Sequence, residues 1–213
     1  MLRGRDIKKF GYDYADLWLI ATLPSLKVNI EDYPSVKQHL ITFGIDRLKQ
    51  TGELGSRKKT NNKWFETQDS ISYWEDFSKQ KIIYPEITKF LNFYCDTKGF
   101  MTNNKCFILT GENIHFLTAF LNSSLFKFCF RNNFPELLGG SRELRKVFLE
   151  ELNIIKVDDK IDNKCKAIIN QIIENKLQAR EILSLEKELD ELVFTLYALT
   201  DEEKSQVGFI TIQ

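Results

Sequence analysis

The stretch YWEDFSKQKIIYPEI, from Tyr73 to Ile87, joins an aromatic and charged lead-in to a compact apolar run. Ile82, Ile83 and Tyr84 favour a buried β-strand, because β-branched and aromatic side chains pack well on a pleated surface. Pro85 cannot donate a backbone hydrogen bond and therefore ends the strand. We expect this strand to lie in the core.

Other strands are predicted on both sides of it. Leu17–Ile20, closed by Pro24, is expected to form a first strand, and Val147–Val157 a last one. Between them, an aromatic strand near Phe90–Tyr94, a turn at Asp96–Gly99 and a strand at Lys105–Leu109 indicate an antiparallel hairpin or meander.

Two helical patterns interleave with these strands. A helix opens at Pro34, with Val36, Leu40 and Phe43 at helical spacing. A second, strongly apolar helix starts at Asn113 and is expected in the middle of the fold. The pattern predicts an α+β fold with a mixed or antiparallel sheet and packed helices.

The C-terminal part is a helical tail. Its apolar stripe repeats at alternating spacings of four and three, which predicts one long helix or two: Leu185, Leu189, Leu192, Leu196, Leu199. Thr200 to Glu203 forms a capping box, and Phe209 to Ile212 are expected to return onto the body. We therefore predict a domain over 1–158 and a tail over 159–213 that packs on the body or on a partner.

Composition excludes several classes of protein. The 213 residues are 43% hydrophobic, enough for a sizeable core. No apolar run approaches the ~18 residues of a membrane span, and MLRGRDIKKF lacks the apolar part of a secretion signal. We expect a cytoplasmic protein with no membrane partner. The four cysteines lie far apart, so neither zinc nor a disulfide framework is indicated.

The formal net charge of zero hides a segregation of charge. Residues 1–10 and 49–63 are basic, whereas residues 180–203 carry eight acids against Arg180 and Lys187. A polyanion would be steered toward the basic segments. Solvated surface is the ordinary alternative.

The loop from Thr51 to Thr67 combines cations, amides and the pair Trp64-Phe65, as phosphate neutralisation and base-edge hydrogen bonding require. A flexible surface loop would have a similar composition. Gly139-Gly140 precedes further basic residues, although the spacing is not that of a Walker phosphate loop. The candidate DNA-binding residues are Arg3, Arg5, Lys8, Lys9, Arg57, Lys58, Lys59, Asn61, Asn62, Lys63, Trp64, Lys98, Arg142 and Arg145.

Catalytic motifs are missing from the sequence. There is no glycine-rich methyl-donor loop, no Asn/Asp-Pro-Pro-Tyr/Phe motif for a flipped adenine and no Pro-Asp followed by Glu-x-Lys for metal-dependent cleavage. His39 and His115 have no nucleophile or ligand at a useful spacing. We expect a chain that is not an enzyme by itself and binds no cofactor or metal.

Five phrases carry a resemblance to a known family: LRGRDIKKFG (2–11), the stretch at 73–87, CFILTG (106–111), FLTAFLNSSLFKFCF (116–130) and LVFTLYALTDEE (192–203). The first four resemble the TaqI-like C-terminal specificity domain of adenine-specific DNA methyltransferases and combined restriction-modification enzymes. The last resembles the helical tails of type I specificity subunits. The resemblance runs from about Arg3 to Val157, and the chain's start within the first phrase suggests an excised domain.

That resemblance implies a sequence-specific DNA recognition module. Its partners would be double-stranded DNA and the methyltransferase or endonuclease domains of a parent polypeptide, which would hold S-adenosylmethionine and Mg²⁺. The family's loops vary with the site read, so the resemblance does not assign base contacts. The alternative is a protein-interaction or scaffolding module that uses the leucine-rich helix. A nuclease or methyltransferase is a distant third, which the missing motifs argue against.

Overall fold

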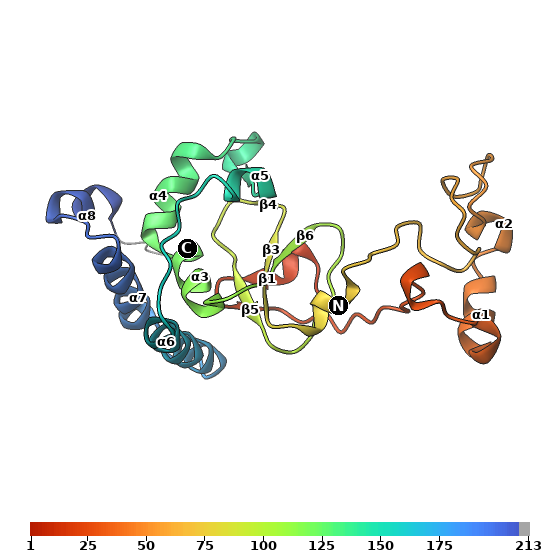
Figure 1. Ribbon diagram of the computed structural model, residues 1–213, viewed down its shortest axis with the longest axis horizontal. Coiled ribbons are helices and arrows are strands. Elements are labelled where there is room, and N and C mark those ends of the chain that lie inside the picture. The colour runs from red at the N-terminus through yellow and green to blue at the C-terminus, as the bar shows by residue number, and fades with distance from the viewer. Residues whose placement is uncertain (209–213) are drawn as a thin grey trace. The chain divides into compact units, whose positions relative to one another are not determined.

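The computed structural model describes residues 1–208, and within them the chain forms two compact units (Figure 1). Unit 1 comprises Met1–Leu17 and the chain from Phe77 onward, and unit 2 is Trp18–Asp76. The short 3-10 helix η4 (Trp74–Ser78) spans the second change of unit. The expected return of Phe209 to Ile212 onto the body lies outside the described residues.

A three-stranded antiparallel sheet is the centre of unit 1, in the order β5-β3-β6. The middle strand β3 (Lys81–Pro85) is buried at every position, as its apolar run predicts. β5 (Tyr94–Asp96) pairs Cys95 with Ile82, and β6 (Cys106–Leu109) pairs Ile108 with Ile83. The predicted antiparallel pairing is confirmed, but β5 and β6 flank β3 and do not pair with each other.

The aromatic strand is displaced from its predicted position at Phe90–Tyr94 to Tyr94–Asp96. The Thr88 hydroxyl donates to the carbonyl of Phe90 and accepts from its N–H, which turns the chain there. The turn after β5 is confirmed, since the Asp96 carboxylate accepts from the N–H groups of Lys98 and Phe100.

Smaller antiparallel pairs complete the β-structure of unit 1. β1 (Ile7–Lys8) pairs with β2 (Gly11–Tyr12) after the 3-10 helix η1 (Gly4–Asp6), and β4 (Ile87–Thr88) pairs with β7 (Arg142–Glu143). β4 continues directly from the central strand β3, so β7 and the preceding 3-10 helix η5 (Leu138–Gly140) are held beside the main sheet.

The apolar helix predicted from Asn113 is two helices, α3 (Ile114–Leu121) and α4 (Ser124–Asn133). Ser123 caps α4 by accepting from the N–H of Phe126, which starts a new helix there. The side-chain amide of Asn122 accepts from the N–H of Phe93 and donates to its carbonyl, which ties the break to the sheet. The main core lies between these helices and the sheet and includes Phe93, Phe120 and Phe126.

The tail consists of α6 (Asp159–Leu177), α7 (Leu183–Leu196) and α8 (Asp201–Val207). Its predicted leucine stripe packs into the main core of unit 1, where Leu189 and Val193 are buried together with Ile168 and Ile172 of α6. The predicted capping box of Thr200 and Glu203 is confirmed at the start of α8. The division at 158/159 remains a prediction.

The predicted last strand, Val147–Val157, is wrong. Its first residues form the short helix α5 (Lys146–Leu149), and no strand follows before α6. The core-packed apolar residues of this stretch do not alternate along it as the two-residue period of a strand requires: Phe148, Leu149, Leu152, Ile155 and Val157.

Unit 2 is mostly irregular. It contains the 3-10 helices η2 (Pro24–Leu26) and η3 (Ile30–Asp32), then α1 (Pro34–Ile41) and α2 (Ile45–Leu48). Leu23, Ile30 and Phe65 are its buried apolar residues. The helix at Pro34 and the loop after Thr51 are confirmed. The strand at Leu17–Ile20 is wrong, because these residues have no strand partner and Trp18 is 84% exposed.

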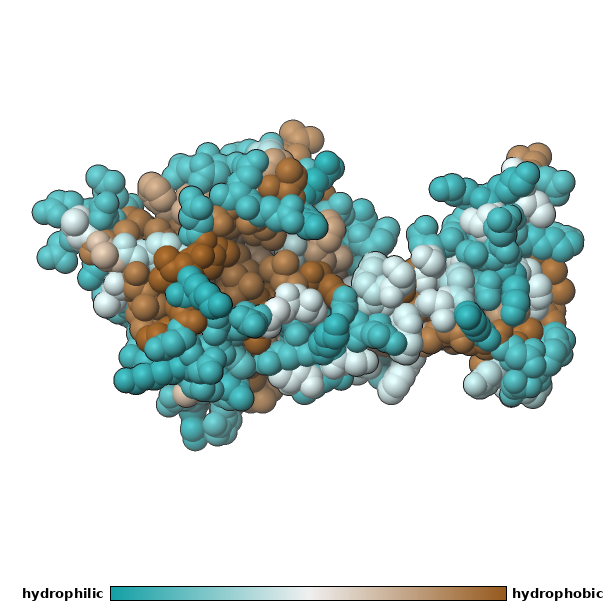
Figure 2. Space-filling view, in the orientation of Figure 1, coloured by the Kyte–Doolittle hydropathy of each residue, from teal (hydrophilic) through white to brown (hydrophobic). Residues whose placement is uncertain are grey.

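Helices and antiparallel strands together confirm the α+β class with a helical C-terminal region. Figure 2 shows apolar side chains at the surface on the helical side of unit 1. Nowhere in 1–208 is a helix both long and apolar enough to cross a membrane.

Candidate nucleic-acid interface

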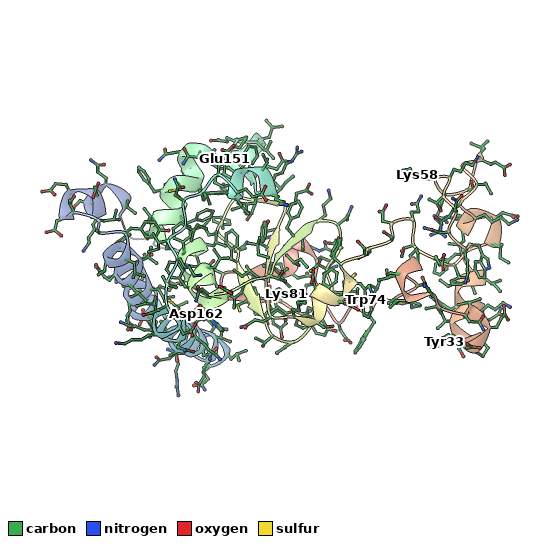
Figure 3. The ribbon with its side chains drawn as sticks, in the orientation of Figure 1. Tyr33, Lys58, Trp74, Lys81, Glu151 and Asp162 are labelled. Carbon is green, nitrogen blue, oxygen red and sulfur yellow. The ribbon has the colours of Figure 1, made fainter. Side chains whose placement is uncertain are left out.

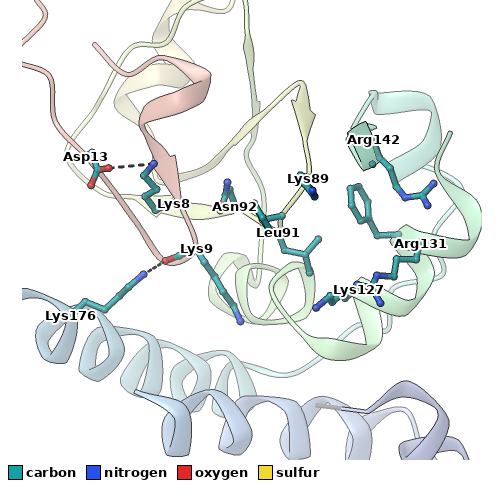
Figure 4. Close-up of a pocket in the computed structure, with 13 residues that line it drawn as sticks. Lys8, Lys9, Asp13, Lys89, Leu91, Asn92, Lys127, Arg131, Arg142 and Lys176 are labelled. Atoms are coloured by element: carbon teal, nitrogen blue, oxygen red, sulfur yellow. Dashed lines mark hydrogen bonds and ion pairs between the residues drawn. The ribbon is translucent and has the colours of Figure 1, made fainter. Parts of the chain in front are cut away.

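A basic cleft of about 810 Å³ opens in unit 1 between the N-terminal segment, the turn after β4, helix α4 and helix α6 (Figure 4). One carboxylate, that of Asp13, lines it. Seven cationic side chains line it as well: Lys8, Lys9, Lys89, Lys127, Arg131, Arg142 and Lys176. Such an excess of positive charge in a concave surface attracts anions.

Helix α4 supplies two of these cations, Lys127 and Arg131. They are four residues apart and therefore share one face of the helix, while Phe126 and Phe130 turn into the core. Burial lowers the pKa of Lys127, and the nearby charges of Arg131 and Lys9 lower it further. Like charges so close together favour a bound anion.

Lys9 and Lys176 connect the N-terminal segment to the tail helices. The Lys9 side chain is 11% exposed, and its ammonium lies 3.1 Å from the carboxylate of Glu186 on α7. Burial lowers the pKa of Lys9, and Glu186 opposes this effect. The Lys176 ammonium donates to the carbonyl of Lys9 at 2.5 Å. The main role of Lys9 is thus structural, because it joins the N-terminal segment to α6 and α7.

Arg142 holds the loop that precedes it. Its guanidinium donates to the carbonyl of Phe134 at 2.5 Å and to the carboxylate of Glu136 at 2.8 Å, and it lies 6.0 Å from the centre of the Phe130 ring. Gly139 and Gly140 both have φ of 75°, a conformation that few other residues adopt. Gly140 lines the cleft.

A second hollow of about 610 Å³ adjoins the first and shares Lys8, Lys89 and Asn92 with it. It adds the side chains of Arg5 and Lys105, and that of Arg3. Arg3 is committed to Asp6, with its guanidinium nitrogens 2.8 and 2.9 Å from the carboxylate oxygens. That contact lowers the pKa of Asp6. The two hollows form a continuous basic surface on unit 1.

The predicted loop of unit 2 is folded by its own polar side chains. Gln50 is buried and donates to the carbonyls of Lys63 and Glu66, at 3.2 and 2.8 Å. The Arg57 guanidinium donates to the carbonyls of Leu48 and Trp64, at 2.7 and 2.5 Å. The loop is therefore a defined surface that displays the side chains between these anchors, including Lys58 (Figure 3).

A family model, the TaqI-like C-terminal specificity domain, matches residues 1–154. The chain belongs to this family. It is thus a specificity domain of the restriction-modification type, and the matched residues extend over unit 2 and end before α6.

A curated relative supports this placement. The type II methyltransferase M.MjaIV of Methanocaldococcus jannaschii is 25% identical over 173 residues, which are 76% of this chain and 54% of the relative. The chain spans about half the length of that methyltransferase.

The structure brings only some of the predicted residues of this specificity domain together. Lys8, Lys9 and Arg142 meet in the basic cleft, and Arg3 and Arg5 lie in the adjoining hollow. Lys8 also pairs with Asp13 at 3.3 Å. The residues from Arg57 to Trp64 belong to unit 2 and form their own cluster.

Within that cluster the side chains differ in availability. Lys58, Lys59, Asn61 and Lys63 are exposed, and Trp64 is half-buried against Phe65. The Asn62 amide instead donates to the carbonyls of Thr67 and Gln68. Asn62 and Arg57 therefore shape the loop, whereas Lys58, Lys59, Asn61 and Lys63 lie at its surface.

The two remaining predicted residues lie in unit 1 outside the residues that line the basic cleft. Lys98 donates to the Tyr12 hydroxyl at 2.8 Å and lies over its ring. Arg145 is exposed and pairs with Glu143 at 2.7 Å. Neither is buried, so both remain candidates.

Sequence reasoning missed four cations of the cleft: Lys89, Lys127, Arg131 and Lys176. The pair Lys127 and Arg131 carried a usable signal, because two cations at helical spacing on an otherwise apolar helix are conspicuous. Lys89 and Lys176 join them only through tertiary structure.

His115 has a partner that the sequence did not indicate. Its Nδ1 lies 2.8 Å from the carboxylate of Asp162 on α6, and its Nε2 lies 2.8 Å from the Gln80 amide (Figure 3 labels Asp162). The other Asp162 oxygen accepts from the N–H groups of His115 and Phe116 and so caps α3. This arrangement joins α6 to α3. Across the described part of the chain, no group of three His, Cys, Asp or Glu residues could hold a metal ion.

Proposed function

We propose that this specificity domain recognises a short duplex DNA sequence for an adenine-specific methyltransferase, or a combined methyltransferase and endonuclease, whose catalytic domains belong to the same polypeptide. The observation that carries the proposal is the basic cleft, with seven cations against one carboxylate, in a chain of this family. Phosphate neutralisation by lysine and arginine supplies most of the affinity of a DNA-binding protein.

The two units supply different kinds of contact in this proposal. The cations of the cleft and of the adjoining hollow hold phosphates, which position the duplex without reading it. The exposed loop of unit 2 combines Lys58, Lys59 and Lys63 with Asn61, whose amide can pair with adenine in the major groove. Sequence reading is therefore assigned to unit 2.

We also propose that the domain is non-catalytic and that S-adenosylmethionine and Mg²⁺ bind elsewhere in the parent. The family to which the chain belongs is one of specificity domains. The sequence carries neither a methyl-donor loop nor a motif for a flipped adenine. Calorimetry with S-adenosylmethionine should give no binding heat. Saturable binding would contradict this assignment.

Duplex selection tests the proposal directly. A randomised duplex pool is incubated with the domain at low salt, and the retained DNA is sequenced and titrated beside a scrambled control. Enrichment of one short site supports sequence reading. Salt-sensitive binding without enrichment would limit the domain to phosphate contacts, and no binding at low salt would contradict the proposal.

A protein-interaction function through the leucine stripe has less support. Leu189 and Val193 are buried within the chain, and Leu185, Leu192 and Leu196 pack against the same core. A stripe already used for internal contacts leaves little apolar surface for a partner. A stable dimer that is lost when Leu183, at the exposed start of α7, is changed to Ser would favour this alternative.

A further inference from the structure

The size of the basic cleft restricts what it can hold. About 810 Å³ is far less than a length of duplex occupies, but it lies within the range of sites that bury a small organic molecule. The cleft is therefore large enough to take a single nucleotide in addition to the phosphate contacts proposed above.

Four cations of the cleft have no carboxylate partner among residues 1–208, and one of them, Lys176, instead donates to the carbonyl of Lys9. Lys8 pairs with Asp13, Lys9 with Glu186 and Arg142 with Glu136. In contrast, Lys89, Lys127 and Arg131 make no ion pair within the described chain. They come from the turn after β4 and from one face of α4, and all line the same hollow (Figure 4). These three side chains are available to a phosphate group.

An apolar wall lies beside these cations. Phe90 lines the cleft and is 51% exposed, and the adjacent Leu91 and Phe130 are buried. An exposed aromatic ring next to unpaired cations matches the two halves of a nucleotide, because a base stacks on the ring and a phosphate meets the cations. A free inorganic anion would make no use of the ring.

We propose that the basic cleft binds one unpaired nucleotide, with its phosphate at Lys89, Lys127 and Arg131 and its base against Phe90. This inference rests on the proposed DNA recognition and adds to it a pocket for a nucleotide that has left the base stack. The same chemistry is offered by a free deoxynucleotide, and the test separates the two sources.

The test compares two labelled duplexes that differ by one unpaired nucleotide at the centre. A bulged nucleotide is already unstacked, so the wild-type domain should bind the bulged duplex about tenfold more tightly than the paired one at low salt. The measured quantity is the ratio of the two dissociation constants.

The variants address the two halves of the nucleotide. In the double variant Lys127→Ala/Arg131→Ala and in Phe90→Ala, the ratio should fall to about one. Lys166→Ala, an exposed cation of α6 that does not line the cleft, should leave the ratio unchanged. Circular dichroism melts would verify that all variants fold.

The outcomes distinguish this inference from the proposed function. Equal binding of both duplexes by the wild type, or variants that weaken both equally with the ratio intact, would overturn the nucleotide pocket and leave DNA recognition standing. If neither duplex binds, the proposed function fails. NMR titration of the domain with dAMP then tests the pocket. Chemical-shift changes in the wild type that the double variant abolishes would support a free nucleotide as the ligand. A wild-type domain without chemical-shift changes would overturn the inference.

Discussion

At the scale of single residues, several cations predicted to contact DNA form hydrogen bonds or ion pairs within the chain. Arg57 bridges two backbone carbonyls of the unit 2 loop, and Arg3 is paired with Asp6. The sequence identifies the cations but not their partners. An arginine that bonds backbone carbonyls and one that binds a phosphate are the same letter in the sequence.

Arg57 and Lys58 are neighbours with different expected roles. Arg57→Ala removes two charge-assisted hydrogen bonds and should lower the free energy of unfolding of unit 2 by about 1.5–3 kcal/mol. Lys58→Ala should change stability by less than about 0.5 kcal/mol but reduce the slope of log K against log salt by about 0.9. Urea unfolding and salt-dependent DNA titration measure these effects. Equal loss of stability in both variants would contradict the assignment.

The four cysteines are expected to be nearly inert. Burial raises the pKa of each thiol, to about 12 for Cys106 and Cys165. Because only the thiolate reacts, the thiolate fraction at pH 8 falls about a thousandfold when the pKa rises from 9 to 12. Iodoacetamide labelling at pH 8 should therefore be slow, should accelerate with rising pH and should become fast in urea. Rapid labelling of the folded domain would show accessible thiols.

At the scale of elements, the sequence identified most helices and the central strand but not their junctions. β3 was predictable because its apolar run is short and ends at proline. The break between α3 and α4 depends on Asn122 bonding Phe93, a contact between residues far apart in sequence. The wrong strand at Leu17–Ile20 is apolar but has no neighbouring strand to pair with, and apolar character alone does not supply a partner.

The leucine stripe of α7 gives a test at this scale. Leu189 is 2% exposed in the core, so Leu189→Ala should lower the free energy of unfolding by about 2–5 kcal/mol through lost burial and a cavity. Leu183→Ser, at a 39% exposed position of the same helix, is the control and should have little effect. Urea unfolding followed by circular dichroism measures both. If Leu189→Ala were neutral while Leu183→Ser changed the oligomeric state, the stripe would serve a partner instead.

At the scale of the whole molecule, the residues matched by the family model and the residues that form the main core cover different ranges of the chain. The match ends at residue 154, yet Ile168 and Ile172 of α6 and Leu189 and Val193 of α7 belong to the same core as the sheet. The tail therefore supplies part of the hydrophobic stabilisation of unit 1. No pattern in the sequence indicated that Trp18–Asp76 would form a separate unit, since its borders carry no glycine-rich or proline-rich linker.

The two units should unfold as separate transitions, and the chain provides a probe for each. Trp18, Trp64 and Trp74 all belong to unit 2, whereas the long helices that dominate circular dichroism belong to unit 1. In unit 1 the fully buried Lys81 ammonium pairs with Asp96 (Figure 3 labels Lys81). Asp96→Ala would leave a buried charge unpaired and should destabilise unit 1 by about 3–5 kcal/mol.

In urea, Asp96→Ala should move the circular dichroism transition to lower denaturant and leave the tryptophan fluorescence transition in place. Glu188→Ala, an exposed position on α7, is the control and should move neither. A coincident shift of both signals would show that the chain unfolds as one cooperative unit. Independent transitions would mean that the exposed loop of unit 2 is held by its own contacts, chiefly those of Gln50 and Arg57, and that its side chains can vary without cost to the core of unit 1.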